Sequence, residues 1–97
     1  MPMKISALKE KMAAREGMML LDVREPDEVA DGGMMPGAVN IPMGKVFVEA
    51  GKGALPKDTP IVTICRSGVR AEIVARELKE RGYDVDFLEG GMTAWEE

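Results

Sequence analysis

The sequence predicts an α/β fold in which a mainly parallel sheet of about five strands is flanked by helices on both faces. Two continuous apolar runs, Met18–Val23 and Ile61–Ile64, are typical of strands that are buried on both sides. A helical pattern from Ala71 to about Arg81 follows the second run, and its two Glu–Arg pairs are spaced four residues apart with the acid first. Strands that alternate with helices in this way are joined by crossovers, so we expect them to run parallel.

Local signals along the chain define the remaining elements. Ser6 precedes a helical pattern as a candidate N-cap, and Gly17 and Gly82 each end a helical pattern. The expected elements are, in order, a short strand over Met3–Ile5, a helix over Ala7–Glu16, a strand over Met18–Val23, a helical turn over Asp27–Ala30, a strand over Ala38–Ile41, a helix over Gly44–Ala50, a strand over Ile61–Ile64, the helix from Ala71, a strand over Asp84–Leu88 and a helical tail after the turn that begins at Glu89.

Length and composition limit the function classes that need to be considered. With 97 residues, of which 45% are hydrophobic, the chain is expected to form one domain over residues 1–97. The net charge is −4 and the basic residues do not form a run, so nucleic acid is not an expected partner. No stretch approaches the roughly 20 apolar residues of a membrane span, and the N-terminus lacks the apolar core of a secretory signal. We therefore expect a cytoplasmic protein that does not bind membranes.

The chain contains one cysteine and no histidine. A single cysteine cannot form an internal disulfide, which suits a reducing compartment. A zinc site built from Cys and His is excluded, and no metal, nucleotide or organic cofactor is indicated. Because the usual general base is also missing, any cysteine chemistry would have to rely on stabilisation of the thiolate by its surroundings.

Cys65 lies where the strand Ile61–Ile64 should end and the next helix should begin. At such a junction backbone N–H groups point inward, and the helix dipole adds partial positive charge. Both effects favour the thiolate, which is the nucleophilic form of cysteine. The carboxyl ends of parallel strands are also where ligand sites of open α/β sheets lie. The sequence therefore predicts an anion cradle with Cys65 as the nucleophile at its floor.

The residues that follow Cys65 support this interpretation to different degrees. Arg70 lies in the first turn of the helix, and we expect it to bind an anion rather than to pair with Glu72 or another neighbour. Arg66 can bind the anion in the same way or point to solvent. Gly68 permits tight backbone curvature. Ser67 can donate its hydroxyl to the sulfur or cap the following helix.

Asp22 and Arg24 end the first apolar run, close to the predicted site. An acid and a base two residues apart at a strand end can be taken for a catalytic pair. We interpret them as an ion pair that holds the structure near the site, because such pairs are abundant at protein surfaces.

Four motifs of the chain resemble, in order, those of rhodanese-like sulfurtransferase domains. They are LDVREPDE at Leu21–Glu28, GMMPGAVNIP at Gly33–Pro42, CRSGVR at Cys65–Arg70 and LEGGMTAW at Leu88–Trp95. Each motif alone is weakly specific, but together they cover nearly the whole chain and resemble a single-domain member of the thiosulfate sulfurtransferase family. Met34 stands where this family usually has histidine, and we expect it to alter packing there without loss of the chemistry.

The resemblance implies a reaction in two steps. The Cys65 thiolate would attack the outer sulfur of a donor such as thiosulfate, release sulfite and remain as a persulfide. Cyanide or a thiol would then accept the sulfur, and such a covalent intermediate gives ping-pong kinetics. The groups expected to cradle the terminal sulfur are the backbone N–H groups of Arg66, Ser67, Gly68, Val69 and Arg70.

Two other functions remain open from the sequence. Cysteine phosphatases and arsenate reductases also hold a thiolate in an oxyanion cradle, but their signature has five residues between Cys and Arg. Four residues separate Cys65 from Arg70, and this shorter loop suits a single sulfur atom better than a tetrahedral phosphate. A persulfide carrier, which takes sulfur from a protein donor and passes it to a protein acceptor, would keep the same nucleophile.

Overall fold

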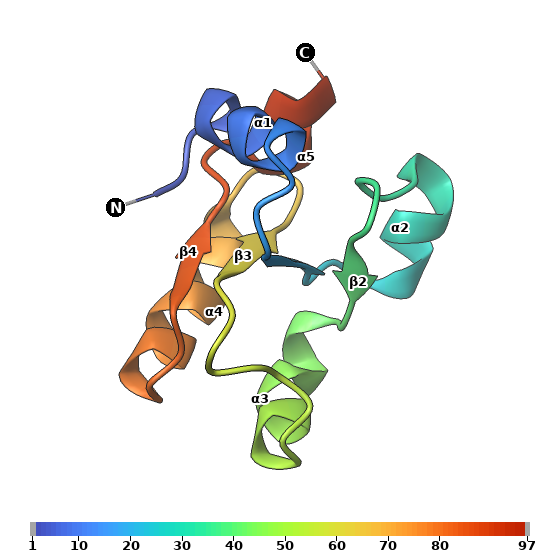
Figure 1. The fold of residues 1–97 in the computed structure, drawn as a ribbon. Coiled ribbons are helices and arrows are strands. Elements are labelled where there is room, and N and C mark those ends of the chain that lie inside the picture. Colours follow the sequence, from blue (N-terminus) through green and yellow to red (C-terminus); the bar gives the residue numbers. More distant parts are fainter. Residues whose placement is uncertain (1, 97) are drawn as a thin grey trace.

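The computed structural model describes residues 2–96, and its sheet has four strands in the order β2-β1-β3-β4, with every neighbouring pair parallel. Figure 1 shows α1 and α5 lying together near one end of the sheet and α2 beyond the edge strand β2. The elements are α1 (Ile5–Ala13), β1 (Met19–Asp22), α2 (Pro26–Gly32), β2 (Val39–Asn40), α3 (Met43–Gly51), β3 (Ile61–Ile64), α4 (Val69–Glu80), β4 (Val85–Phe87) and α5 (Gly91–Glu96).

The predicted α/β class, with a parallel sheet covered by helices on both faces, is confirmed. Along β1 and β3 successive side chains point to opposite faces, so neighbouring residues enter different core clusters. Leu21 and Ile61 pack in the cluster that contains residues of α3 and α4. Leu20 and Val62 pack in the other cluster, with residues of α1 and α5. The central strands are therefore buried on both sides, as their continuous apolar runs predict.

The sheet has four strands rather than about five, and the difference lies at the N-terminus. Met3 forms only an isolated parallel bridge with Leu88, through which its N–H donates to the carbonyl of Phe87 at 2.9 Å. The helix then begins at Ile5, so the chain leaves the sheet before a strand can extend. Ser6 lies inside α1 and is not its N-cap, which is an extended Lys4 without a side-chain cap.

The junction of β3 and α4 positions Cys65. The helix begins at Val69, two residues before the predicted start, because Gly68 adopts a φ of 107° and turns the chain directly from the loop into the helix. A Cβ at Gly68 would also lie 3.4 Å from the Leu88 carbonyl oxygen. Thr63 of β3 is fully buried, and its hydroxyl donates to the carbonyl of Ala71 at 2.8 Å. This bond ties the strand to the first turn of the helix across the loop.

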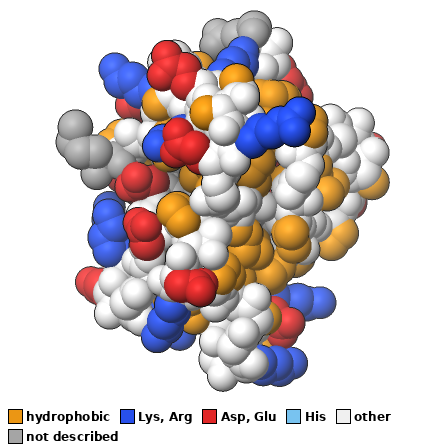
Figure 2. Space-filling view, viewed as in Figure 1, with side chains coloured by type: hydrophobic (Ala, Val, Ile, Leu, Met, Phe, Trp, Pro, Cys, Tyr) orange, Lys and Arg blue, Asp and Glu red, His pale blue; other side chains and the backbone are white. Residues whose placement is uncertain are grey.

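The surface carries mixed charge. In Figure 2, basic and acidic side chains lie interspersed over the face shown, and hydrophobic side chains gather toward its centre. Among residues 2–96, none of the helices has both the length and the apolar character that crossing a lipid bilayer requires.

Candidate functional site

Backbone donors converge on the sulfur of Cys65. The residue follows β3 directly and is only 1% exposed. Its Sγ accepts hydrogen bonds from the N–H groups of Gly68 at 3.0 Å and Ala71 at 3.4 Å. Both donors belong to the N-terminal end of α4, where the helix dipole is positive. The arrangement stabilises negative charge on the sulfur without any side-chain donor.

The N–H groups around the sulfur have few protein partners. Among residues 2–96, no acceptor is recorded for the N–H groups of Arg66, Ser67, Val69 and Arg70. The first N–H groups of any helix have no partner within the helix, and the loop before α4 adds others to this set. The loop can therefore supply several backbone donors to one anionic atom held beside Cys65.

The start of α5 binds the carbonyls of Cys65 and Arg66. The N–H of Met92 donates to the Cys65 carbonyl at 2.9 Å, and the N–H and hydroxyl of Thr93 both donate to the Arg66 carbonyl at 3.1 Å. A Cβ at Gly91 would overlap the Cys65 carbonyl oxygen and would lie 2.8 Å from that of Arg66. This close approach gives the LEGGMTAW motif a role in the site that the sequence analysis did not assign.

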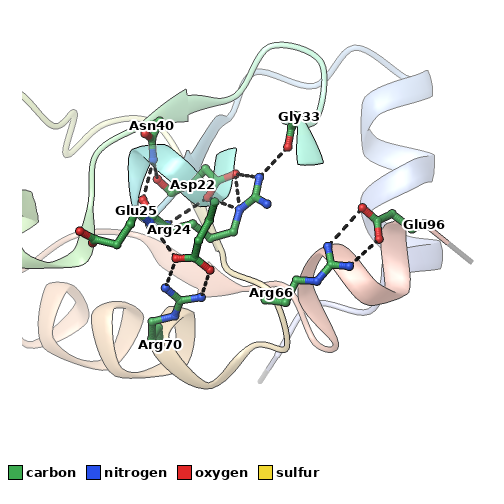
Figure 3. Close-up of polar contacts among 9 residues, drawn as sticks. Asp22, Arg24, Glu25, Gly33, Asn40, Arg66, Arg70 and Glu96 are labelled. Carbon is green, nitrogen blue, oxygen red and sulfur yellow. Dashed lines mark hydrogen bonds and ion pairs between the residues drawn. The ribbon is translucent and has the colours of Figure 1, made fainter. Parts of the chain in front are cut away.

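Asp22 and Arg24 form a buried ion pair beside the site. The guanidinium of Arg24 donates to both carboxylate oxygens of Asp22, the shortest bond being 2.7 Å, and also to the carbonyl of Gly33 at 2.7 Å (Figure 3). The hydrogen bond with Asp22 raises the pKa of Arg24. The amide of Asn40 donates to the carbonyls of Asp22 and Arg24, both at 2.9 Å. These bonds fix the end of β1 against β2 and against the segment that precedes β2.

Arg70 is paired with Glu28 of α2. The two terminal nitrogens of Arg70 donate to the two oxygens of Glu28 at 2.6 and 2.9 Å. This bidentate bond raises the pKa of Arg70 and lowers the pKa of Glu28 to about 2. Glu28 is 42 residues away in sequence, so spacing along the chain did not show it as a partner. Its place in the LDVREPDE motif, close to Asp22 and Arg24, is the only sequence signal that could have found it.

Arg66 is paired with the last described residue. Its guanidinium donates to the two oxygens of Glu96 at 3.2 and 3.0 Å, and the pair is largely exposed (Figure 3). Both arginines of the CRSGVR motif are therefore bound by carboxylates. A hollow of about 300 Å³ lies beside them, lined by Arg24, Glu28, Asp31, Gly32, Arg66 and Glu96.

The remaining predicted residues lie at the outside of the loop. Ser67 is exposed, and it does not cap α4, whose N-cap is Gly68 without a side-chain bond. No bond from its hydroxyl to Cys65 is recorded among residues 2–96. Val69 is 64% exposed, so only its backbone faces the site. Met34 is also exposed, whereas the adjacent Met35 is buried in the core.

Comparison with known proteins agrees with this geometry. Residues 5–97 match the family model described as a rhodanese-like domain. YtwF of Bacillus subtilis (strain 168), named as a candidate sulfurtransferase, is 48% identical over 91 residues, which cover 94% of this chain and 85% of YtwF. YrkF of the same organism, named as a candidate sulfur carrier protein, is 37% identical over 94% of this chain and 48% of YrkF.

A solved structure shows the same fold. The crystal structure of a rhodanese-like domain protein from Staphylococcus aureus superimposes with a TM-score of 0.85 and 31% identity, over 98% of this chain and 91% of that one. Relatives of this chain are therefore named for sulfur transfer, and the chain carries the loop, the following helix and the four ordered motifs. The chain belongs to the family of rhodanese-like domains.

Proposed function

We propose that this chain transfers sulfane sulfur from thiosulfate, or a related persulfide donor, through a persulfide on Cys65 to a thiol or cyanide. The Cys65 thiolate attacks the outer sulfur of thiosulfate, the donor's S–S bond breaks, and sulfite leaves with the electron pair. The new persulfide carries the negative charge on its terminal sulfur. The acceptor then takes that sulfur, and Cys65 returns to the thiolate.

The observation that carries this proposal is the set of backbone donors at the sulfur. The N–H groups of Gly68 and Ala71 already point at Cys65 Sγ, and the first N–H groups of α4 lie beside them. A terminal persulfide sulfur is a single anionic atom and needs donors from several directions. Loss of one well-placed donor of this kind typically costs about 10²–10³ in rate. The roles of Arg66, Ser67, Gly68, Val69 and Arg70 in this cradle are therefore mainly those of their backbone.

A second candidate is a persulfide carrier that takes sulfur from a protein donor and gives it to a protein acceptor. The pairing of Arg66 with Glu96 and of Arg70 with Glu28 favours it, because these carboxylates offset the positive charge that would attract a small dianion. A single free thiol at the centre of either function suits a reducing compartment such as the cytoplasm.

Intact mass spectrometry tests the proposal directly. Wild-type protein is incubated with thiosulfate, freed of excess reagent and weighed, with Cys65→Ser as the matched control. We expect the wild type alone to gain one sulfur atom, and cyanide to remove it as thiocyanate. Loading only from a protein persulfide would favour the carrier. Failure to load from any sulfane-sulfur donor, or hydrolysis of an aryl phosphate instead, would contradict sulfur transfer.

A further inference from the structure

We propose that Glu28 sets the donor preference of the site by neutralising Arg70, so that singly charged sulfane-sulfur donors are used in preference to the thiosulfate dianion. The inference rests on the proposed sulfur transfer through Cys65 and adds a residue that determines its specificity. Glu28 does not contact Cys65, and it acts through the charge of Arg70.

Arg70 lies in the first turn of α4, at the end of the helix whose N–H groups donate to Cys65 Sγ. Its neighbour in the chain, Ala71, donates its N–H to Cys65 Sγ at 3.4 Å. The negative charge of the Cys65 thiolate is also one of the causes that raise the pKa of Arg70. An anion entering the loop would therefore feel the field of Arg70, unless another group offsets that field.

A capping hydrogen bond holds Glu28 where its charge offsets the field of Arg70. Its Oε1 accepts the N–H of Glu25 at 2.9 Å, in a capping box that begins α2. The same carboxylate binds both terminal nitrogens of Arg70, and its pKa of about 2 keeps it ionised at neutral pH. Because one carboxylate satisfies the start of one helix and the arginine of another, it cannot swing away from Arg70 without losing the cap.

The charge of each loop arginine is therefore matched by the charge of its own partner. Arg66 and Arg70 contribute two positive charges, and their partners Glu96 and Glu28 contribute two negative charges. The bidentate bond uses two of the five N–H donors of Arg70, so this side chain can still donate to an oxygen of a donor molecule. What the pairing removes is the net charge that would favour a dianion over a monoanion.

Two small sulfur donors react in the same way but differ in charge, so they isolate the effect of charge on the rate. Thiosulfate carries two negative charges, and methanethiosulfonate carries one because a methyl group replaces a charged oxygen. With either donor the Cys65 thiolate takes the outer sulfur and an S–S bond breaks. The electron pair leaves on sulfite in the first case and on methanesulfinate in the second. The ratio of kcat/KM for thiosulfate to that for methanethiosulfonate therefore reports how the site responds to the additional charge.

The central variant is Glu28→Gln, measured with both donors and cyanide as the acceptor. Glutamine keeps an oxygen for the N–H of Glu25, so α2 retains its cap while Arg70 regains its net charge. We expect the donor ratio to rise on the order of tenfold toward thiosulfate at low salt, and less in 1 M salt. Glu77→Gln is the matched control, because it removes the same charge from an exposed pair with Arg81 in the C-terminal half of α4. It should leave the ratio unchanged.

Removal of Arg70 completes a double-mutant cycle of Glu28 and Arg70. In Arg70→Gln the donor ratio should not rise above that of wild type when Glu28→Gln is added, because no guanidinium charge remains for Glu28 to neutralise. The inference is overturned if the donor ratio of Glu28→Gln equals that of wild type, if wild-type protein uses thiosulfate but not methanethiosulfonate, or if Glu77→Gln raises the ratio equally. Failure of the proposed function is a different result, in which wild-type protein acquires no sulfur by intact mass from either donor. If Glu28→Gln does not fold, Arg70→Gln alone decides the question: the unmatched charge of Glu28 should lower the donor ratio below that of wild type, and an unchanged ratio would overturn the inference.

Discussion

Two of the arginine–carboxylate pairs near the loop differ mainly in burial. Arg24–Asp22 and Arg70–Glu28 have similar bonds, with shortest contacts of 2.7 and 2.6 Å. The side chains of the first pair are 2% and 1% exposed, whereas both side chains of the second are 34% exposed. The first therefore acts as a structural tie within the fold. The second is reached by solvent, and under the proposed function it tunes the charge of the site.

Breaking the buried pair should have the largest effect on stability. In Asp22→Asn the guanidinium of Arg24 stays buried without a counter-charge, and the expected loss is about 3–5 kcal/mol of the free energy of unfolding. Urea denaturation followed by circular dichroism measures it. The double variant Asp22→Asn with Arg24→Met should recover part of the loss, because it removes the uncompensated charge. A loss below about 1 kcal/mol would show that burial does not separate the two pairs.

Breaking the half-exposed pair should lower the free energy of unfolding by less, and this loss should depend on pH. Since Arg70 lowers the pKa of Glu28 from 4.5 to about 2, this pair stabilises the fold fully above pH 4.5. That stabilisation is lost as the pH falls from 4.5 through 2. Glu28→Gln should therefore lose about 1 kcal/mol or less at pH 7, since solvent screens the pair, and the gap to wild type should close near pH 2. Urea midpoints at pH 7, 4 and 2.5 measure the gap, and a gap independent of pH would show that the charge of Glu28 does not stabilise the fold.

The same contrast explains what could be predicted from the sequence. The buried strands β1 and β3 were predicted to within a residue or two because burial on both sides leaves a local apolar run. The pair of Asp22 with Arg24 is also local, and its residues are two apart. Met3 was expected to begin a strand, but among residues 2–96 it forms a single bridge, with Leu88, and nothing near Met3 in the sequence shows that the pairing stops there.

In the site, too, local features were predictable and contacts between distant segments were not. Cys65 and its backbone donors follow from a strand that runs into a helix, which the local sequence displays. The partners of the two loop arginines do not follow from it, because Glu28 and Glu96 come from distant segments that only the folded chain brings together. Gly91 was part of a recognised motif, but its role depends on the distance to the Cys65 carbonyl. The position of Cys65 and of its backbone donors was therefore predictable, and the charge around it was not.

The third pair near the loop extends the comparison to a more exposed case. Arg66 and Glu96 are 51% and 41% exposed, so Glu96→Gln should change the free energy of unfolding by about 0.5 kcal/mol or less. Whatever effect exists should vanish in 1 M NaCl, because the screening length there is only about 3 Å. Urea denaturation in 20 mM and 1 M NaCl measures both. A larger or salt-independent loss would mean that Glu96 supports α5, whose Met92 and Thr93 hold the loop carbonyls, and not merely the charge of Arg66.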